Sequence, residues 1–454
     1  MEWLALLLFL FTVIFLLIGF PVAFSLGGAA LIFAIFGIIG GTFDAAFLSS
    51  MPNRIYGIMT NETLLAIPLF VFMGITLERA GIAEELLDTL GQLFGNIRGG
   101  LGISVTIVGM LLAASTGIVG ATVVTMGLLA LPTMLKNGYS PSISAGTICA
   151  SGTLGQIIPP SIILVMLGDV ISSSYQQSQL SQGVFSPKTV SVGDLFAGAL
   201  IPGLLLVFLY ITYLIVIGFI KPSKMPAHTV TVSGKIYIKN IFKALIAPLT
   251  LIITVLGSIL GGVATPTEAA GVGASGSLLI AIHKKQLSLS KLQGIMRSTL
   301  RISSMVFMIL IGASVFSLVF RGYGGDDLVR SLLIDLPGGI FTAVLVVMVV
   351  MFLLGFVLDF IEITFVVVPI IGPVLLSMGL DPIWLGIMIA INLQTSFLTP
   401  PFGFALFYLR GIAPTSISTA QIYKGVVPFV GIQILMLMII SLFPGLVTWL
   451  PNQL

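Results

Sequence analysis

Two carboxylates lie deep in an apolar part of the sequence where other charged side chains are absent. Asp359 and Glu362 are the acidic residues between Phe341 and Leu380. A carboxylate within a membrane-length apolar segment is costly and is typical of a site for an ion or a substrate. We expect Asp359 to belong to such a site. For both acids the alternative is a turn that simply reaches water, and the sequence favours neither role for Glu362.

Polar side chains also gather just before two double prolines, Pro159-Pro160 and Pro400-Pro401. Proline interrupts the hydrogen bonds of a helix and frees backbone carbonyl oxygens. A hard cation prefers such oxygen ligands, and helix N-termini exposed at a break attract anions. Hydrogen bonding between helices is the alternative role for these polar residues. They are Ser151, Thr153, Gln156, Asn392, Gln394, Thr395 and Thr399.

The two double prolines belong to an internal repeat. They lie 241 residues apart, and at that offset Pro132 aligns with Pro373 and Pro141 with Pro382. Ordinary side chains hardly match, so the repeat preserves backbone geometry. Repeated breaks in apolar helices are typical of the binding sites of secondary transporters. Prolines that merely kink helices for packing would not explain the shared register.

Two further apolar segments, 100–137 and 340–378, are interrupted near their middle by ASTGIVG and by GFVLDFIE. Two half-length helices around a turn predict a re-entrant hairpin, which is tolerated at membrane depth only inside protein or beside a wet cavity. We expect each hairpin tip to work with one broken helix, 142–170 for the first and 382–410 for the second. The sequence therefore predicts two sites of similar geometry.

The predicted binding residues come from these tips and breaks. The first expected pair is the tip Ser115–Thr122 with the break Ser151–Ser161. The second expected pair is the tip Gly355–Thr364 with the break Asn392–Phe402. The candidate substrate- and ion-binding residues are Ser115, Thr116, Gly117, Gly120, Thr122, Ser151, Gly152, Thr153, Gly155, Pro159, Pro160, Gly355, Asp359, Glu362, Thr364, Asn392, Gln394, Thr395, Thr399, Pro400 and Pro401. Sodium is expected, largely on backbone carbonyls, at Ser115, Thr116, Gly152, Asp359, Asn392 and Thr395.

The composition is that of a polytopic helical membrane protein. The chain is 57% hydrophobic and 8% charged, whereas a soluble domain is about one quarter charged. Recurring apolar runs predict an all-α fold with about ten spans and two re-entrant hairpins. One cysteine, Cys149, excludes an internal disulfide framework. An intramembrane enzyme would need clustered acids, His or Cys within the spans, which the sequence does not offer.

Boundaries follow from the apolar runs and from amphipathic patterns. Two amphipathic segments, Ile82–Phe94 and Asp326–Leu336, are expected to lie along the membrane surface. A Ser/Gln-rich loop is expected over Ser172–Ser191, and Asp169 and Arg410 are expected to be anchors at span ends. The spans expected in the first half are Trp3–Phe20, Val22–Ile39, Leu64–Ala80, Ser142–Val170 and Leu195–Ile220.

Charge sets the expected topology. Of the 19 Lys and Arg, ten lie within 221–243 and 284–301, which the positive-inside rule places in the cytoplasm. Both chain ends lack Lys and Arg and are expected outside. The chain then divides into a first repeat, 1–220, a cytoplasmic linker, 221–236, and a second repeat, 237–454. Each half crosses an odd number of times, so the two repeats are predicted to be inverted.

Several motifs resemble the large permease subunit of tripartite ATP-independent periplasmic (TRAP) transporters. They are LFVFMG at 69–74, PTMLKNGYSP at 132–141, LGQIIPPS at 154–161, GVATPTEAA at 262–270 and TPPFG at 399–403. The resemblance covers nearly the whole chain. It implies a sodium-driven, elevator-type importer of organic acids in the bacterial inner membrane, with sodium and substrate held by the tips and broken helices. Asp359 matches the family's hairpin aspartate.

The same resemblance implies partners and leaves one question open. A small four-helix membrane subunit, expected as a separate chain, and a periplasmic substrate-binding protein would complete the transporter, with no cofactor and no nucleic acid. The tip ASTGIVG departs from the phenylalanine- and glycine-rich version of many dicarboxylate members, which leaves the substrate open. A stand-alone sodium/dicarboxylate symporter or an ion antiporter of similar build is the alternative. No Gly-x-x-x-x-Gly-Lys-Ser/Thr loop is present, so an ion gradient must supply the energy.

Overall fold

The structure is a computed structural model that describes residues 3–117, 119–227 and 234–454, without the side chains of 115–116 and 234–244. Every regular element in these ranges is a helix. Apolar segments become helices in a membrane because each backbone N–H and C=O then bonds within its own segment. The predicted all-α fold is confirmed.

In the first half the helices follow the predicted boundaries closely. Val22–Ile39 and Ile82–Phe94 begin and end where the sequence predicts. The elements are α1 (Trp3–Ile18), α2 (Val22–Ile39), η1 (Ala45–Ser50), α3 (Met51–Met59), η2 (Thr63–Leu65), α4 (Ala66–Arg79), α5 (Ile82–Phe94), α6 (Gly100–Thr116), α7 (Val119–Lys136), α8 (Pro141–Thr153), η3 (Leu154–Gln156), α9 (Ile162–Ser181), α10 (Val192–Ile220) and η4 (Pro222–Lys224).

The second half has helices at the positions where the sequence predicts a surface helix, a hairpin and a broken helix. The linker predicted at 221–236 contains η4 and the first residues of α11, while 228–233 lie outside the described residues. The elements are α11 (Gly234–Leu260), α12 (Pro266–His283), α13 (Leu289–Gly322), α14 (Gly325–Ile334), α15 (Gly339–Leu354), α16 (Phe360–Glu362), the π-helical turn η5 (Ile363–Val367), α17 (Val368–Ser377), α18 (Pro382–Leu398), α19 (Phe404–Ile412), α20 (Thr419–Leu442), α21 (Gly445–Thr448) and η6 (Pro451–Gln453).

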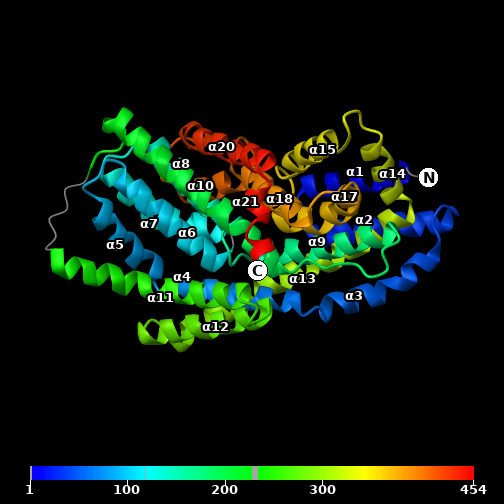
Figure 1. Cartoon of the computed structure of the whole chain (residues 1–454), viewed down its shortest axis with the longest axis horizontal. Helices are drawn as coiled ribbons and strands as arrows, with labels where there is room; N and C mark the ends of the chain where they lie inside the picture. Colours follow the sequence, from blue (N-terminus) through cyan, green and yellow to red (C-terminus); the bar gives the residue numbers. More distant parts are fainter. Residues whose placement is uncertain (1–2, 118, 228–233) are drawn as a thin grey trace. The chain divides into compact units, whose positions relative to one another are not determined.

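The first hairpin consists of α6 and α7, which pack against each other (Figure 1). α6 ends at Gly117, whose φ of 61° lies in the left-handed region that favours glycine. The N–H of Gly117 donates to the carbonyl of Ala113 at 2.9 Å and so closes the last turn of α6. The turn lies within the segment ASTGIVG, as predicted.

The second hairpin consists of α15 and an arm built from α16, η5 and α17. α15 ends at Gly355, and Asp359 is the N-cap of α16. Pro369 cannot donate to the carbonyl of Phe365 four residues earlier, and the wider π-helical turn η5 lies at this position. The break falls inside the predicted segment GFVLDFIE.

Both predicted broken helices are interrupted at their double prolines. α8 is followed directly by the 3-10 helix η3, which ends before Pro159-Pro160, and α9 begins at Ile162. α18 ends before Pro400-Pro401, and α19 begins at Phe404. Each Pro-Pro peptide bond is cis. The helices stop here because proline lacks an N–H and restricts the residue before it.

The predicted loop over Ser172–Ser191 is wrong in its first part, because α9 continues to Ser181. Ser174 and Ser178 are buried on this extension. The Gln179 side chain donates to the carbonyl of Lys188 at 2.9 Å and accepts from its N–H at 2.9 Å. These contacts stabilise a helix where serine and glutamine alone suggested irregular backbone.

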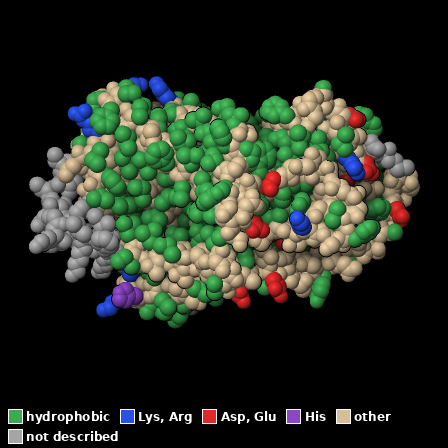
Figure 2. Space-filling view, viewed as in Figure 1, with side chains coloured by type: hydrophobic (Ala, Val, Ile, Leu, Met, Phe, Trp, Pro, Cys, Tyr) green, Lys and Arg blue, Asp and Glu red, His purple; other side chains and the backbone are tan. Residues whose placement is uncertain are grey.

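The structure is that of a multi-pass membrane protein. Among the described residues, six helical segments are long and apolar enough to cross a bilayer, and a pair of segments bent by 51°, 45–59 with 63–79, could form a seventh. Shorter apolar helices such as α1, α15 and α18 accompany them. On the face shown in Figure 2, hydrophobic side chains predominate and charged side chains are few. The six segments are Val22–Ile39, Val119–Lys136, Val192–Ile220, Leu289–Gly322, Phe360–Ser377 and Thr419–Leu442.

The chain forms two compact units, and each draws on both halves of the sequence. The first unit comprises Met1–Leu65, Met166–Ser191 and Leu300–Gly386. In it α1 packs on α2, and α15 and α14 pack on α17. The second unit comprises the remaining stretches, Ala66–Val165, Val192–Thr299 and Ile387–Leu454. There α8 packs against α6, α7 and α20, while α4 packs against α12.

Candidate functional site

The first hairpin tip and the first broken helix meet in the second unit. A Cβ atom at Gly117 would lie 3.1 Å from the backbone nitrogen of Ile162, the first residue of α9. A Cβ atom at Gly155 would lie 3.2 Å from the carbonyl oxygen of Ala113 in α6. Because glycine has no Cβ, these two predicted site residues allow the hairpin tip to lie directly against the break in the helix. The sequence predicted this pairing, and the structure brings the two segments together.

Two more predicted glycines allow close packing around this tip. A Cβ atom at Gly152 would lie 2.3 Å from Cγ2 of Val123, so α8 lies very close to α7. A Cβ atom at Gly120 would lie 2.8 Å from the Tyr408 ring of α19. Real Cβ atoms essentially never approach a neighbour within 3.0 Å, so a larger residue at Gly152 or Gly120 would require Val123 or the Tyr408 ring to shift.

The two broken helices also meet inside the second unit. Nε2 of Gln394 donates to Oγ1 of Thr153 at 3.4 Å, and both side chains are fully buried. The two residues are 241 positions apart, which is the offset of the internal repeat. Equivalent positions of the two copies are thus in direct contact.

The hydroxyl groups near the breaks donate within their own helices. Oγ of Ser151 donates to the carbonyl of Thr147 at 2.5 Å, and Oγ1 of Thr395 donates to Ile391 at 2.7 Å. Thr153 and Thr399 bond in the same way to Ala150 and Thr395. Because a hydroxyl has one proton and two lone pairs, these oxygens keep lone pairs for a cation or another donor.

Several buried polar atoms at the breaks, and one a helical turn before the first break, have no hydrogen-bond partner among the described residues. Both amide atoms of Gln156, Oε1 of Gln394 and Oγ1 of Thr147 belong to this group. Gln156 and Gln394 are fully buried. Buried polar groups are nearly always paired, so unpaired atoms indicate a ligand, an ion or a water molecule. In chemical terms the region offers oxygen ligands and amide donors.

The second hairpin tip lies in the first unit and has a different chemistry. Oδ1 of Asp359 accepts from the N–H of Phe360 at 2.7 Å, and Oε2 of Glu362 accepts from the N–H of Asp359 at 3.0 Å. This reciprocal arrangement is a capping box that starts the second arm. The Asp359 side chain is exposed, whereas Glu362 is buried. Asp359 therefore has a structural role as an N-cap, and its exposed carboxylate also remains available to an ion.

Glu362 and Thr364 face the interior of the first unit. Glu362 lines a cavity of about 10 Å³ together with apolar residues of α1, α2 and α13. Thr364 is fully buried, and its Oγ1 lacks a partner among the described residues. The second predicted pair combines this tip with a break that belongs to the second unit. The site residues assigned to that pair stay a prediction.

The remaining predicted site residues are buried, cap a helix or lie outside the described residues. Thr122 and Asn392 are buried, and Gly355 is the C-cap of α15. The side chains of Ser115 and Thr116, which were predicted sodium ligands, lie outside the described residues. In the part of the chain that the structure describes, no three His, Cys, Asp or Glu side chains cluster as metal ligands would. The predicted sodium sites would therefore depend largely on backbone and hydroxyl oxygens, with Asp359 as the one carboxylate among the predicted ligands.

The first unit contains a polar group that the sequence did not predict. Asp169 was expected to be an anchor at a span end, but its Oδ1 accepts from Nδ2 of Asn61 at 2.9 Å beside a cavity. Polar residues at helical spacing could have indicated this, because Asp169, Ser173 and Gln177 share one face of α9. The other expected anchor, Arg410, donates to the carbonyl of Ile417.

An ion pair holds the predicted surface helix α14. Nε of Arg321 lies 3.1 Å from Oδ2 of Asp326. Partial burial raises the pKa of the Asp326 carboxyl above its ordinary value, and the nearby Arg321 guanidinium opposes that rise. The ion pair joins the end of α13 to the first turn of α14, where a carboxylate also favours the helix dipole.

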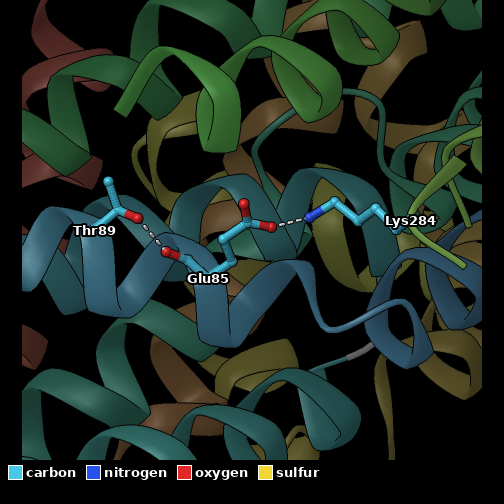
Figure 3. Close-up of polar contacts among 3 residues, drawn as sticks. All are labelled: Glu85, Thr89 and Lys284. Atoms are coloured by element: carbon cyan, nitrogen blue, oxygen red, sulfur yellow. Dashed lines mark hydrogen bonds and ion pairs between the residues drawn. The ribbon is translucent and has the colours of Figure 1, made fainter. Parts of the chain in front are cut away.

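The other predicted surface helix, α5, is held by a similar pair (Figure 3). Lys284, just after α12, forms an ion pair and a hydrogen bond with Glu85. Thr89, one turn further along α5, donates to the backbone carbonyl of Glu85 at 2.6 Å. α5 also packs on α6, the first arm of the hairpin. The surface helix thus connects the hairpin to α12 within the second unit.

Comparison with known proteins identifies relatives along almost the whole chain. The C4-dicarboxylate TRAP transporter large permease protein DctM of Vibrio cholerae is 30% identical over 472 residues, covering 99% of this chain and 97% of that protein. The sialic acid TRAP transporter large permease protein SiaM of Vibrio cholerae is 28% identical and covers 96% of this chain and 95% of its own. The ectoine TRAP transporter large permease protein TeaC of Halomonas elongata is also 28% identical, with 96% of each chain covered.

Solved structures share the fold. The YdaH transporter of Alcanivorax borkumensis matches with a TM-score of 0.64 over 90% of each chain. At 15% identity this likeness concerns the fold alone.

The family itself is established by a direct match. Residues 9–446 match the family model described as "Tripartite ATP-independent periplasmic transporter, DctM component". The motifs that resembled TRAP permeases lie within this range, so the resemblance is confirmed. The glycine-lined tip, the two proline breaks and the family match together lead to one conclusion: this chain belongs to the DctM family, the large permease subunits of TRAP transporters, and is a membrane transport protein rather than an enzyme.

Proposed function

We propose that this chain imports a small organic acid anion together with sodium. The anion would arrive on a periplasmic substrate-binding protein, and a separate small membrane subunit would complete the complex in the inner membrane. Membership of the family supports this, because relatives are named for C4-dicarboxylate, sialic acid and ectoine transport. In the proposed arrangement about ten spans and two re-entrant hairpins form inverted repeats with both termini in the periplasm.

The contact between Thr153 and Gln394 is the observation that carries this proposal. A residue that touches its own equivalent in the other repeat lies close to the pseudo-two-fold axis. Transporters built from inverted repeats bind substrate and ions where the repeats meet, at discontinuous helices. The buried Gln156 amide, which has no partner among the described residues, lies on the same break.

The polar groups around the breaks are suitable ligands for both sodium and an organic anion. Sodium is a hard cation, and hydroxyl oxygens and freed carbonyls around the breaks are suitable ligands. A carboxylate suits the amide donor of Gln156 and the N-termini of the helices that follow the breaks, α9 and α19. In the proposed cycle sodium organises the tips, the anion binds beside them, and the part that carries them slides across the membrane.

The direct test is transport by the complete system in proteoliposomes, with the binding protein, the small subunit and an imposed sodium gradient. Asp359→Asn keeps a good N-cap but removes the charge at the tip. We expect a loss of uptake of about tenfold or more, with a weakened dependence on sodium. Asp381→Asn is the matched control, because Asp381 also caps a helix, through the N–H of Trp384 at 2.8 Å, and is exposed.

The outcomes separate the alternatives. Uptake by Asp359→Asn that equals wild type and keeps the same sodium dependence would remove Asp359 from the mechanism. Uptake that needs sodium but no binding protein would instead indicate a stand-alone symporter. If potassium replaces sodium without effect, the coupling ion assigned here is wrong.

A further inference from the structure

Arg79, the last residue of α4, lies against the first part of α13 in the second unit. Its Nη2 donates to Oγ of Ser298 at 2.9 Å. A Cβ atom at Gly294 would overlap Nη1 of Arg79, so the guanidinium lies directly on the helix where glycine leaves room. The hydrogen bond fixes one edge of the guanidinium and leaves other N–H groups for an acceptor outside the protein.

More basic residues gather around this arginine. Lys291, Gly294 and Ser298 are three or four residues apart, so they share the face of α13 that Arg79 covers. Arg297 lies on the adjoining face. In the part of the chain that the structure describes, no salt bridge reaches Arg79, Lys291 or Arg297. Like charges held together without a counter-charge favour a bound anion.

The acidic residue next to Arg79 does not neutralise this basic group. Oε1 of Glu78 accepts from Oγ1 of Thr125 in α7 at 2.8 Å, so this carboxylate is engaged by the hairpin. The segment 284–301 contains five basic residues and no Asp or Glu. The group therefore has an excess of positive charge along its own segment.

The acids of the neighbouring helix α5 are also placed elsewhere. Glu85 forms an ion pair with Lys284 (Figure 3). Glu84 and Asp88 are four residues apart and lie about 60–100° round the helix from Glu85. Among the described residues no salt bridge joins either of them to a basic side chain. A ligand must therefore supply the negative charge.

The length of α13 places the basic group at the level of lipid headgroups. The stretch 302–320 has no charged residue and as a helix is about 29 Å long, which matches the hydrocarbon core of about 30 Å. Arg297 and Ser298 precede this stretch by five and four residues, so they lie about 6–8 Å outside the core. The positive-inside rule predicts that this end of α13 is cytoplasmic.

An apolar stripe borders the basic group on the same helix. Leu289 and Met296 are exposed and seven residues apart, so they lie on one face. Arg297 lies about 100° round from Met296, between this stripe and the face that Arg79 covers. An exposed apolar face beside a basic face is typical of a helix that contacts a membrane surface. A phospholipid fits both faces, with its acyl chains on the stripe and its phosphate on the arginines.

We propose that Arg79 and Arg297 bind the headgroup of an anionic phospholipid, with Lys291 adding a third positive charge. Each guanidinium offers a planar pair of donors to the phosphate oxygens. Because Arg79 ends α4 and Arg297 belongs to α13, one headgroup joins two helices of the second unit. The site uses none of the residues proposed to bind the transported anion, and it does not depend on the import function.

The test counts lipids on the full-length chain purified with its small subunit. Native mass spectrometry measures how phosphatidylglycerol and phosphatidylcholine, added in detergent, are retained, with glycerol 3-phosphate as a soluble competitor. The variants are Arg79→Gln, Arg79→Lys and Arg297→Gln. Arg98→Gln is the matched control, because Arg98 is an exposed arginine of the same unit beside Gly218, close to the predicted cytoplasmic linker.

We expect wild type to bind phosphatidylglycerol about tenfold or more tightly than phosphatidylcholine, and Arg79→Gln and Arg297→Gln each to weaken that binding about fivefold or more. Arg79→Lys retains the charge but loses the planar pair of donors, so it should lie between wild type and Arg79→Gln. Arg98→Gln should bind like wild type. Phosphatidylglycerol should raise the melting temperature of wild type and of Arg98→Gln, but not that of Arg79→Gln combined with Arg297→Gln.

Several results would overturn the proposal. Unchanged phosphatidylglycerol binding in both Gln variants would remove the two arginines from the site, and Arg297→Gln tests this even if Arg79→Gln does not fold. An equal loss in Arg98→Gln would indicate general attraction between charges. Displacement of the lipid by an equal concentration of glycerol 3-phosphate would assign the site to a soluble phosphate. Binding only to the chain without its small subunit would show that protein, not lipid, covers this face.

Discussion

At the scale of single residues, the buried amides at the breaks are the most informative groups. Gln156 and Gln433 are both fully buried glutamines in the second unit, yet their surroundings differ. Nε2 of Gln433 donates to the Tyr210 hydroxyl at 2.8 Å, whereas Gln156 has no partner among the described residues. A buried polar group without a partner lowers stability by about 1–3 kcal/mol. Such a cost is typical of a residue whose partner arrives during function.

The two glutamines give a matched prediction. Gln156→Leu should leave the melting temperature unchanged or raise it, because no hydrogen bond is lost, and should abolish anion uptake. Gln433→Leu should destabilise the protein by about 1–3 kcal/mol, because the buried Tyr210 hydroxyl loses its partner. Thermal unfolding in detergent and proteoliposome uptake per folded molecule are the measurements. Normal uptake by Gln156→Leu would show that its amide binds neither substrate nor ion.

At the scale of elements, close glycine contacts hold the first broken helix. A Cβ atom at Gly425 of α20 would lie 1.9 Å from the carbonyl oxygen of Ser142 in α8. A Cβ atom at Gly146 of α8 would lie 2.1 Å from the carbonyl oxygen of Gly425. Two helix backbones are therefore in direct contact, as small residues permit inside membranes. This contact holds the helix that carries the first break.

Substituting these glycines tests the contact. Gly425→Ala should lower stability by about 1–3 kcal/mol, because the added methyl group meets backbone rather than a flexible side chain. Gly431→Ala is the control on the same helix, since nothing lies within 4 Å of a Cβ at that position. Thermal unfolding of both variants in the same detergent is the measurement. Equal melting temperatures would contradict the close approach of α8 and α20.

The ion pair that joins α5 to the residue after α12 is a second contact between elements. The Glu85 and Lys284 side chains are partly exposed, so we expect a coupling free energy of about 0.2–1 kcal/mol. A double-mutant cycle with Glu85→Gln and Lys284→Gln measures it by thermal unfolding. Glu84→Gln, a change at an exposed neighbour on α5, should show no coupling to Lys284→Gln. A coupling equal to that of Glu84 would indicate that the pair does not stabilise α5.

At the scale of the whole molecule, charge distribution predicts a topology that can be tested directly. The chain has one cysteine, Cys149, which is fully buried and should not react. New cysteines replace Asn452 and Ser223, two exposed residues. We expect a membrane-impermeant maleimide to label the first in intact spheroplasts and the second only after permeabilisation. Labelling of both from the same side would rule out inverted halves.

The organisation into units could not be read from the sequence. Each compact unit takes stretches from both repeats, and the hairpins are divided between the units. The 241-residue offset identifies equivalent residues in the two repeats. It does not tell which helices of one repeat pack against which helices of the other. Contacts such as that of Thr153 with Gln394 depend on residues 241 positions apart.

Backbone rules that act over a few residues explain what the sequence determined by itself. Hydropathy along the chain predicted the helices, and glycine and proline predicted the turn at Gly117 and the breaks at both double prolines. The motif pattern predicted the family. These features are local, so they depend little on distant contacts.

Tertiary structure decided which side chains meet and which remain without a partner. Two hydrogen bonds between the Gln179 side chain and the Lys188 backbone stabilise the extension of α9. Asp169, which was expected to be an anchor at a span end, lies in a cavity wall together with Arg54. It also made the Asp359–Glu362 pair a capping box, with one acid exposed and the other buried. The physical reason is that burial and pairing depend on neighbours from distant segments, and a single sequence does not state which segments become neighbours.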